Sequence, residues 1–565
     1  MKKVFQIFNQ INALRLFYIL IIFSLILSIL EYGFIYIIYS LVDYQLTSNV
    51  NLLLEDVINY FKEIFETKFK FIDIILIFLI IIFCFKTIIY IFYNYLISFF
   101  SQNISFNLSK LIFANSLSNK KDVLINNTNS SYFKNTIIVD IPLFVSSVVQ
   151  PLFFLVNDAL ILAAILIFLF YTNPLISLYL VLFIFFTCLV FYLYLKNKLI
   201  KWGYIREKSS TNLIKNLNEV YKGLLEIKIY NVAKYFFSKV LYELNSIKES
   251  LIKTNFFIHF PRIVLEIIIF FSIFFLIFVS SNNKSDISVL PYLSAAVAAA
   301  IKIIPMFSRI MTGIQGYYFA KEVVNKVNAL INNNSIKEDL FENSKKFKGV
   351  DKIQIKNFSF KFKDKILLNK INLVIKKNSI IGITGESGSG KSTFARVLGG
   401  VEKNFTGSIK YFDKKDQLKY GLPALGLSAI IPQDVFAFDD TLENNITFNS
   451  REKKLIKYKK SIKNLLKNLG IDRNRIIGED GKKISGGQKQ RLGIIRSLFF
   501  DKEILIFDES TSNLDKKNKL IILNLVKQLK QEKLILIISH DKKFLDICDK
   551  LFELKEGRLL KRKRI

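Results

Sequence analysis

The sequence is poor in several residue types, and each shortage limits what the chain can be. Its 565 residues include three cysteines, two histidines and one tryptophan. Cys84 and Cys188 lie in apolar runs and Cys548 lies in a charged segment, a pattern unlike the paired framework of a small secreted protein. We therefore expect free thiols. Acidic residues are also scarce, with 46 Asp and Glu against 79 Lys and Arg, for a net charge of +33.

What the chain has in excess is apolar side chains. Hydrophobic residues make up 52% of it, and its mean hydropathy is +0.34. A soluble domain reaches about 45–50% only when glycine is counted, so a soluble or disordered chain is excluded. Basic charge of this size could indicate nucleic-acid binding, but cytoplasmic loops of membrane proteins are also rich in Lys and Arg. We predict a membrane protein that binds no nucleic acid.

Six apolar runs are long enough to cross a membrane as helices, which takes about 20 residues each. They lie near 14–44, 71–100, 148–170, 174–195, 261–281 and 287–317. The first follows Met1-Lys2-Lys3 without a small-residue cleavage site, so we expect a retained span and not a signal peptide. Segments 101–147 and 196–259 hold most of the loop cations, which places them and the N terminus in the cytoplasm. We expect both segments to extend the helices beyond the membrane.

Two further segments complete this half of the chain. Residues 50–66 place apolar side chains on one helical face, which predicts an amphipathic helix that packs on the spans or lies at the lipid interface. A polar stretch opens after Leu330. We therefore divide the chain into a transmembrane domain at 1–330, a linker at 331–350 and a second domain at 351–565.

The second domain alternates short apolar runs with helical segments. Ile380–Thr384, Ile504–Phe507 and Leu534–Ile538 are such runs, and this is how a buried, mostly parallel sheet is encoded. The sequence predicts an α/β domain.

A phosphate-binding motif follows the first of these strands. The run IIGITGESGSGKST at 380–393 fits G-x-x-x-x-G-K-[ST] through Gly385, Gly390, Lys391 and Ser392. The glycines let backbone N–H groups surround the phosphates, Lys391 reaches the β- and γ-phosphates, and Ser392 can ligate Mg²⁺. The motif predicts a bound nucleoside triphosphate with Mg²⁺.

An acidic pair follows the second strand. The run ILIFDE at 504–509 places Asp508 and Glu509 at the end of an apolar segment. One acidic residue there can hold the Mg²⁺ shell, and its neighbour can orient or deprotonate water. A strand that ends in Asp-Glu is often only structural. Its meaning here comes from the sequence Ser485-Gly486-Gly487-Gln488, about twenty residues upstream.

These motifs together resemble those of the ATP-binding cassette superfamily, in which SGGQ is similar to the signature motif, and the resemblance covers the whole chain. It implies a membrane all-α domain of six transmembrane helices fused to a C-terminal α/β P-loop ATPase domain. It also implies that Ser485, Gly486, Gly487 and Gln488 contact ATP held by the opposite copy. The expected protein is a homodimeric exporter-type half-transporter of the bacterial inner membrane, with its ATPase domain in the cytoplasm.

Other positions match the family residue by residue. Gln433 resembles the Q-loop residue that senses Mg²⁺ and attacking water, Asp515 resembles the D-loop residue, and His540 resembles the switch histidine. Phe362 stands at the adenine-stacking position, although it could instead belong to the sheet core. The resemblance thus implies catalytic roles for Glu509, His540 and Gln433, Mg²⁺ binding by Ser392, Gln433 and Asp508, and ATP binding by Phe362, Gly385, Gly388, Gly390, Lys391, Ser392, Thr393 and Asp508. Asn126–Asn135 and Tyr221–Tyr230 are candidate coupling helices.

Ionisable residues inside the spans cost free energy to bury, and by default they indicate a functional site. Four cations, Lys86, Arg262, Lys302 and Arg309, could line a central cavity and hold an anionic headgroup such as a phosphate or pyrophosphate. They could equally form structural pairs with Glu31, Asp158 and Glu266. Both interpretations remain open from the sequence.

The membrane half is similar to the flippase for lipid-linked oligosaccharides in bacterial protein N-glycosylation. The residues that carry this similarity are Lys86, Pro261-Arg262 with Glu266, Ser285-Asp286-Ile287, and Pro305 with Arg309. It implies a lipid-linked oligosaccharide as substrate. A multidrug, lipid A-type or peptide exporter is the alternative within the superfamily. A membrane protein that uses ATP only to switch shape is the alternative outside transport.

Overall fold

The computed structural model describes residues 2–562, with gaps at 12–13, 48–70, 118–129, 173, 283–288, 333–348, 363–364, 403–404, 422–425, 450–458 and 511–515. The chain divides into two compact units, Met1–Leu340 and Phe341–Ile565, which we call the helical unit and the α/β unit. Four of the predictions lie outside the described residues: the helix near 50–66, Ser285-Asp286-Ile287, most of the linker, and Asp515.

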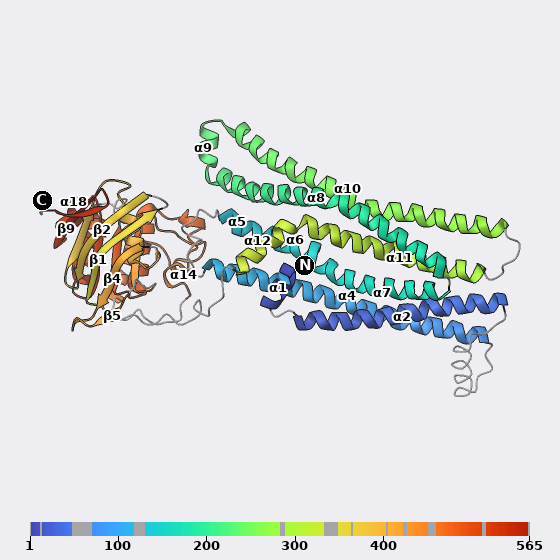
Figure 1. The fold of residues 1–565 in the computed structure, drawn as a ribbon. Helices are drawn as coiled ribbons and strands as arrows, with labels where there is room; N and C mark the ends of the chain where they lie inside the picture. The colour runs from blue at the N-terminus through green and yellow to red at the C-terminus, as the bar shows by residue number, and fades with distance from the viewer. Residues whose placement is uncertain are drawn as a thin grey trace. The chain divides into compact units, whose positions relative to one another are not determined.

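The helical unit consists of long helices that run alongside one another (Figure 1). Its elements are α1 (Lys2–Gln10), α2 (Leu14–Thr47), α4 (Phe71–Leu117), α5 (Ser130–Asn135), η1 (Thr136–Asp140), α6 (Ile141–Phe144), η2 (Val145–Val149), α7 (Gln150–Thr172), α8 (Pro174–Lys222), α9 (Leu224–Ile229), α10 (Ala233–Asn282), α11 (Val289–Phe319) and α12 (Lys321–Asn332). Six of them, α2, α4, α7, α8, α10 and α11, contain the six predicted spans and are 23–50 residues long.

Several of these helices are longer than a membrane is thick. α8 has 49 residues and α10 has 50, more than twice the roughly 20 residues that cross the hydrocarbon. Within the described residues, three stretches are long and apolar enough to span a membrane: Leu14–Leu41, Asp73–Ser116 and Ser131–Phe168. α8, α10 and α11 include side chains outside the described set.

The α/β unit contains two sheets (Figure 1). Its strands are β1 (Lys352–Phe362), β2 (Lys365–Lys376), β3 (Ile380–Thr384), β4 (Phe405–Phe412), β5 (Leu418–Tyr420), β6 (Ser428–Ile431), β7 (Ile504–Asp508), β8 (Leu534–Ile538), β9 (Lys550–Lys555) and β10 (Arg558–Arg562). Its helices are α13 (Lys391–Leu398), α14 (Leu442–Thr447), α15 (Lys459–Leu469), η5 (Glu479–Gly481), α16 (Gly486–Phe499), α17 (Lys516–Leu529) and α18 (Lys542–Asp546).

The larger sheet carries the predicted strands. Its order is β10-β9-β3-β8-β7-β6, and all of its pairs are parallel except that of β10 with β9. Every residue of β3, β7 and β8 is buried, because both faces are covered and each strand is therefore a continuous apolar run. The smaller sheet, β2-β1-β4-β5, is antiparallel. The predicted fold class is confirmed.

Glycines bring helices of the helical unit into close backbone contact. A Cβ atom at Gly203 in α8 would lie 1.9 Å from the carbonyl oxygen of Phe319, at the end of α11. A Cβ atom at Gly316 would lie 2.6 Å from the carbonyl oxygen of Ser147 in η2. Both approaches are closer than any side chain permits, so only glycine fits at these positions.

A charged cluster is buried beside these contacts, and we call it the Asp140 cluster. Asp140 ends η1, a π-helical segment, and is fully buried. The Lys326 ammonium of α12 lies 2.8 Å from an Asp140 oxygen and 2.7 Å from a Glu207 oxygen of α8, and 4.0 Å from the centroid of the Tyr132 ring. Arg206 lies 3.8 Å from the other Asp140 oxygen. One lysine therefore connects three helical segments that are far apart in sequence.

Polar side chains complete the Asp140 cluster. The Asn135 amide donates to Asp140 at 3.0 Å and to the Thr211 hydroxyl at 3.2 Å, while the Ser210 hydroxyl donates to Asn135 at 2.7 Å. The cluster is stable because two carboxylates face two cations, as buried charges require.

We predict that Lys326→Met destabilises the helical unit, because it leaves Asp140 and Glu207 with one remaining cation. Breaking a buried pair from one side costs about 3–5 kcal/mol. The control is Lys321→Met at the start of the same helix, since Lys321 forms no ion pair with any described residue; it should change the free energy of unfolding by less than about 0.5 kcal/mol. Thermal unfolding followed by the fluorescence of Trp202, stacked on Phe257 at 5.7 Å, measures both. Equal losses would contradict the role of the cluster.

Candidate functional site

Most of the predicted nucleotide-site residues gather at one edge of the larger sheet. The carboxyl ends of the parallel strands β3, β8 and β7 lie together, with Ile383 opposite Ile538 and Asp508 opposite Ile538. The phosphate-binding loop follows β3, the acidic pair follows β7, and His540 follows β8. Ligands of open α/β sheets bind at this edge.

The loop after β3 has the backbone conformation that the motif predicts. Gly388 and Gly390 adopt left-handed φ values of 81° and 102°. A Cβ atom at Gly385 would lie 2.4 Å from the carbonyl oxygen of Leu554, so this position also needs glycine. Gly390 is the N-cap of α13, whose first residue is Lys391. Thr393 follows in the first turn of that helix. The loop thus directs a helix N terminus at the sheet edge, where anions bind.

Lys391 is folded back over this loop. Its ammonium donates to the carbonyl oxygens of Gly385 at 2.6 Å and Glu386 at 2.8 Å, and it is only 5% exposed. It also lies 3.9 Å from a carboxylate oxygen of Glu509. This ammonium stands where the phosphates of a nucleotide would be held.

The side chains present fit a Mg²⁺ ion. Asp508 is 9% exposed, and among the described residues its Oδ1 atom is buried without a hydrogen-bond partner. Burial raises the pKa of Asp508, while a hydrogen bond with Ser392 opposes this. A hydroxyl and an unsatisfied carboxylate oxygen are hard oxygen donors of the kind that Mg²⁺ prefers, together with nucleotide phosphates. No group of three or more His, Cys, Asp or Glu that could hold a metal occurs in the described part of the chain.

Glu509 projects toward the same place from a strained backbone. Its φ is 50°, in the left-handed region, which a non-glycine residue adopts at a cost and most often at functional sites. Its N–H donates to the carbonyl oxygen of Ile538 at 2.8 Å, which fixes this conformation. One of its carboxylate oxygens lies 3.6 Å from Nε2 of His540. The structure therefore brings Lys391, Glu509 and His540 together.

Gln433 lies at the same edge, two residues beyond β6. β6 pairs with β7 so that Ile431 stands opposite Phe507. The Gln433 residue is exposed, and its carbonyl oxygen accepts from the Gln490 amide of α16 at 3.3 Å. Its role toward Mg²⁺ and the attacking water stays a prediction.

The SGGQ residues form the start of α16. Ser485 is its N-cap and forms a capping box with Gln488: the Gln488 N–H donates to the Ser485 hydroxyl at 3.3 Å, and the Ser485 N–H donates to Gln488 Oε1 at 2.8 Å. The Gln488 amide also donates to Leu469 at 2.8 Å. Ser485 and Gly486 are exposed, and Gly487 is partly exposed. Among the described residues, none of these hydrogen bonds reaches the phosphate-binding loop.

Two predicted contacts stay predictions. Phe362 is the last residue of β1, and its side chain lies outside the described set. Asp515 also lies outside it.

The charged residues of the spans form ion pairs in the helical unit. Glu31 of α2 is 4% exposed and contacts two lysines: Lys86 of α4 at 2.8 Å and Lys302 of α11 at 3.1 Å. The Lys86 ammonium also lies 4.4 Å from the centroid of the Phe34 ring. Two ammonium groups share one carboxylate, so this group, which we call the Glu31 triad, carries excess positive charge.

The other two cations have partners of their own. Arg309 of α11 donates two hydrogen bonds to the fully buried Asp158 of α7, at 2.7 and 3.0 Å. Arg262 pairs with Glu266 on its own helix at 2.7 Å, and both side chains are exposed. The structure thus brings Lys86 and Lys302 together, and no described contact joins Arg262 or Arg309 to them.

Sequence reasoning missed two groups of residues. Asp140 interrupts an apolar stretch, and this was the available signal for the Asp140 cluster. Arg496 and Asn445, which organise the segment after Gln433, give no such signal because their partners are mostly backbone atoms.

Comparisons with known proteins identify relatives of this chain. A family profile described as "ABC transporter" matches residues 368–512. The ATP-dependent lipid A-core flippase 2 of Colwellia psychrerythraea is 35% identical over 37% of this chain and 37% of its own length. The energy-coupling factor transporter ATP-binding protein EcfA1 of Mycoplasma mobile is 33% identical over 37% of this chain and 78% of its own. The chain thus matches less than half of the flippase relative but most of the ATP-binding protein.

A solved structure, described as that of a bacterial Atm1-family ABC exporter with ATP bound, shares the fold. Its TM-score is 0.73 and its sequence identity 16%, and the match covers 96% of this chain and 94% of that one. The likeness therefore includes both the helical and the α/β unit.

We predict that Glu509→Gln lowers ATP hydrolysis by at least about 100-fold, because a positioned general base contributes about 10²–10⁴-fold and the amide cannot accept a proton. ATP binding should persist, since the side chain keeps its size. Glu556→Gln is the matched control: Glu556 also has a left-handed φ, of 50°, but lies in the β9–β10 turn. Phosphate release by the purified full-length protein measures both. Hydrolysis that survives in Glu509→Gln would exclude Glu509 as the base.

Proposed function

The chain belongs to the ATP-binding cassette transporter family, and from this premise we propose that two copies of it use ATP to move an anionic, lipid-linked substrate across the membrane. The observation that carries the proposal is the convergence of Lys391, Asp508, Glu509 and His540 at one sheet edge. A lipid-linked oligosaccharide is the substrate that we favour. The bacterial inner membrane is the proposed location, with the α/β unit in the cytoplasm.

In this proposal, the residues of the chain have the following roles in ATP binding and hydrolysis. Mg·ATP, when bound, supplies the γ-phosphoryl group and the charge that the site holds. The glycine-loop N–H groups and Lys391 bind and orient the phosphates. Ser392 and Asp508 hold the metal, and Gln433 senses it and the attacking water. Glu509 would accept a proton from the water, and His540, whose Nε2 lies 3.6 Å from a Glu509 oxygen, would stabilise the charge that develops on the phosphate.

A second copy completes each site in this proposal. The capping box holds Ser485 and Gly486 at the exposed N terminus of α16, where N–H groups favour an anion. We therefore propose a homodimer in which SGGQ of one copy covers ATP bound to the other.

Mixed dimers test this arrangement. When Lys391→Ala and Ser485→Arg are placed on different copies, one complete site remains if the signature acts across the dimer, and ATPase activity should be recovered above that of either homodimer. When both changes are placed on one copy beside a wild-type copy, no complete site remains and activity should stay at background. Differently tagged copies, purified as mixed dimers, allow the measurement. The reverse order of activities would show that the signature acts within one chain.

The Glu31 triad supports the anionic substrate. Lys86 is 8% exposed and the Lys302 side chain is 36% exposed, so the triad presents one ammonium that a ligand can reach. Uncompensated positive charge inside a span is expensive, and an anionic headgroup would neutralise it. The other two cations of the sequence analysis are better explained as structural, because Asp158 and Glu266 already neutralise them.

A multidrug or lipid A-type exporter is the second candidate. The similarity to a lipid A-core flippase favours a lipid substrate. An exporter of apolar or cationic drugs would not need the excess charge of the Glu31 triad.

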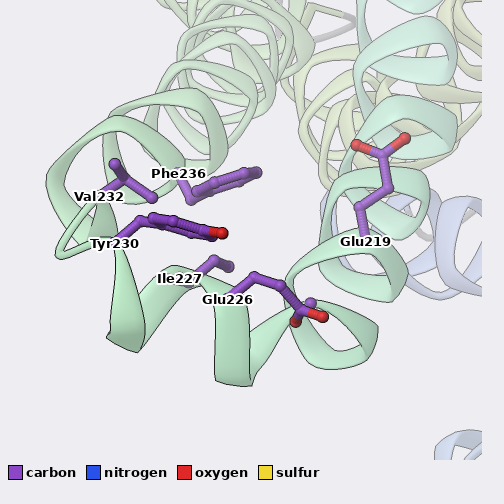
Figure 2. Close-up of a pocket in the computed structure, with 7 residues that line it drawn as sticks. Glu219, Glu226, Ile227, Tyr230, Val232 and Phe236 are labelled. Carbon is purple, nitrogen blue, oxygen red and sulfur yellow. The ribbon is translucent and has the colours of Figure 1, made fainter.

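One of the two candidate coupling helices lies in the turn between α8 and α10. The candidate segment Tyr221–Tyr230 contains α9, and a pocket of about 270 Å³ opens beside it, lined by Glu219, Gly223, Glu226, Ile227, Tyr230, Val232 and Phe236 (Figure 2). Leu225 is 68% exposed and Tyr230 is 73% exposed. Exposed apolar side chains on a polar turn are stabilised when another surface covers them. The other candidate, Asn126–Asn135, is described only from residue 130, where it forms α5 and continues into η1.

We predict that Lys302→Gln reduces ATP-driven movement of a labelled lipid-linked oligosaccharide in liposomes at least fivefold. The change removes the excess charge and leaves Lys86 paired with Glu31, so the fold should be kept. Arg262→Gln is the control, because Arg262 is exposed and pairs on its own helix; it should move the lipid as the wild type does. Lipid movement that is unchanged in Lys302→Gln would show that the excess charge of the Glu31 triad does not bind the substrate.

A further inference from the structure

His540 stands at the tip of a short turn between β8 and α18, which we call the His540 turn. On one side of it, Ser539 is 3% exposed, and its N–H donates to the carbonyl oxygen of Ile383 at 3.2 Å. The Ser539 hydroxyl accepts from the N–H of Asp541 at 3.0 Å, a bond that stabilises turns of this kind. The His540 side chain is 54% exposed, and no hydrogen bond within the described chain holds its ring. The backbone of the turn must therefore place the ring.

Asp541 closes the His540 turn and begins α18. As the N-cap of this helix, its Oδ1 atom accepts from the Lys543 N–H at 3.0 Å. Its carbonyl oxygen accepts from the N–H groups of Phe544 at 3.0 Å and Leu545 at 3.1 Å, and Phe544 is buried in the core. One carboxylate oxygen thus stabilises the helix start, and the other, Oδ2, can bind a different element.

Lys519 of α17 binds that second oxygen. Its ammonium donates to Oδ2 of Asp541 at 2.7 Å, across 22 residues of sequence. The side chains of Lys519 and Asp541 are 23% and 21% exposed. An ion pair so near the surface contributes little to stability, so its effect lies in geometry. With both carboxylate oxygens bound, Asp541 is fixed against two elements, its own helix α18 and the neighbouring helix α17.

The helix that carries Lys519 is itself anchored on both sides. Its Ile522 side chain is fully buried. Asn518, one residue before Lys519, accepts from the Arg491 guanidinium of α16 at 3.0 Å. Arg491 also donates to the carbonyl oxygen of Gly487 at 3.3 Å. Lys519 therefore reaches the His540 turn from a helix whose first turns are held by the core and by α16.

We propose that Lys519 is a positioning residue for ATP hydrolysis, which holds the His540 turn through Asp541 so that the imidazole stays beside the Glu509 carboxylate, 3.6 Å away. Lys519 acts without touching ATP. When its ammonium is removed, Asp541 still caps α18, so the helix stays folded while the turn loses its attachment to α17. This inference rests on the proposed function, because that function gives His540 its part in hydrolysis.

Steady-state hydrolysis by the full-length protein gives the first test. Lys519→Met should lower kcat at least fivefold and leave the KM for ATP within twofold, because the lost interaction acts on the reaction and not on ATP binding. Lys519→Arg keeps a donor for Asp541 and should recover at least half of the wild-type kcat. Lys530→Met is the matched control: Lys530 follows the same helix and pairs with Asp549, also at 2.7 Å, but Asp549 binds the N–H of Ile380 at the start of β3. Its kcat should stay within twofold of the wild type.

A double-mutant cycle separates positioning from a purely structural role. His540→Ala protein has no imidazole to position, so adding Lys519→Met to it should lower kcat by less than twofold. A fivefold loss in both backgrounds would overturn the proposal and leave the proposed function intact. A wild-type kcat in His540→Ala would remove His540 from hydrolysis and overturn both.

A histidine signal provides a readout that needs no turnover. The chain has two histidines, so His259→Gln leaves His540 as the only one. We expect the ring signal of His540, in full-length protein labelled with ¹³C-histidine and purified without a histidine tag, to shift or broaden when Lys519→Met is added. Adding Lys530→Met should leave the signal unchanged. A His540 signal that is the same in both variants overturns the proposal even where hydrolysis by His540→Ala is too slow to measure.

Discussion

Removing a charged side chain from water costs much free energy, and this constraint determines how the helices of the helical unit pair. Three cations of its spans lie beside a buried carboxylate, Lys86 and Lys302 at Glu31 and Arg309 at Asp158. The same rule governs the Asp140 cluster, where Lys326 is neutralised from two helices. Pairing therefore holds the helices in register. Pairing is incomplete at one place, the Glu31 triad, which has one more cation than it has anions.

In the α/β unit, a single helix joins three features that act at different distances from the nucleotide. Ser485 caps α16, Gln490 contacts Gln433 near its middle, and Arg496 donates to the carbonyl oxygens of Asn445 and Phe436 at its end. One helix therefore packs along the loop that follows β6, from Gln433 to Asn445.

How much the sequence could predict depended on whether a feature is local. Short runs of sequence encode the phosphate-binding loop and the strands β3, β7 and β8. The backbone of the loop has the conformation that its motif predicts. Glu31 as the common partner of Lys86 and Lys302 joins α2, α4 and α11, and only the tertiary structure selects it from several possible acids. Arg496 was missed because carbonyl oxygens occur at every residue and leave no pattern. Asp140 was missed although it stands alone in an apolar run.

The central claim is that ATP moves an anionic, lipid-linked substrate across the membrane. The most direct measurement reconstitutes the full-length protein in liposomes with a labelled lipid-linked oligosaccharide and follows the leaflet that it occupies. The account predicts movement that needs ATP, stops in Glu509→Gln and is not competed by a cationic drug. An actively hydrolysing protein that leaves this lipid in place, and moves the drug instead, would contradict it.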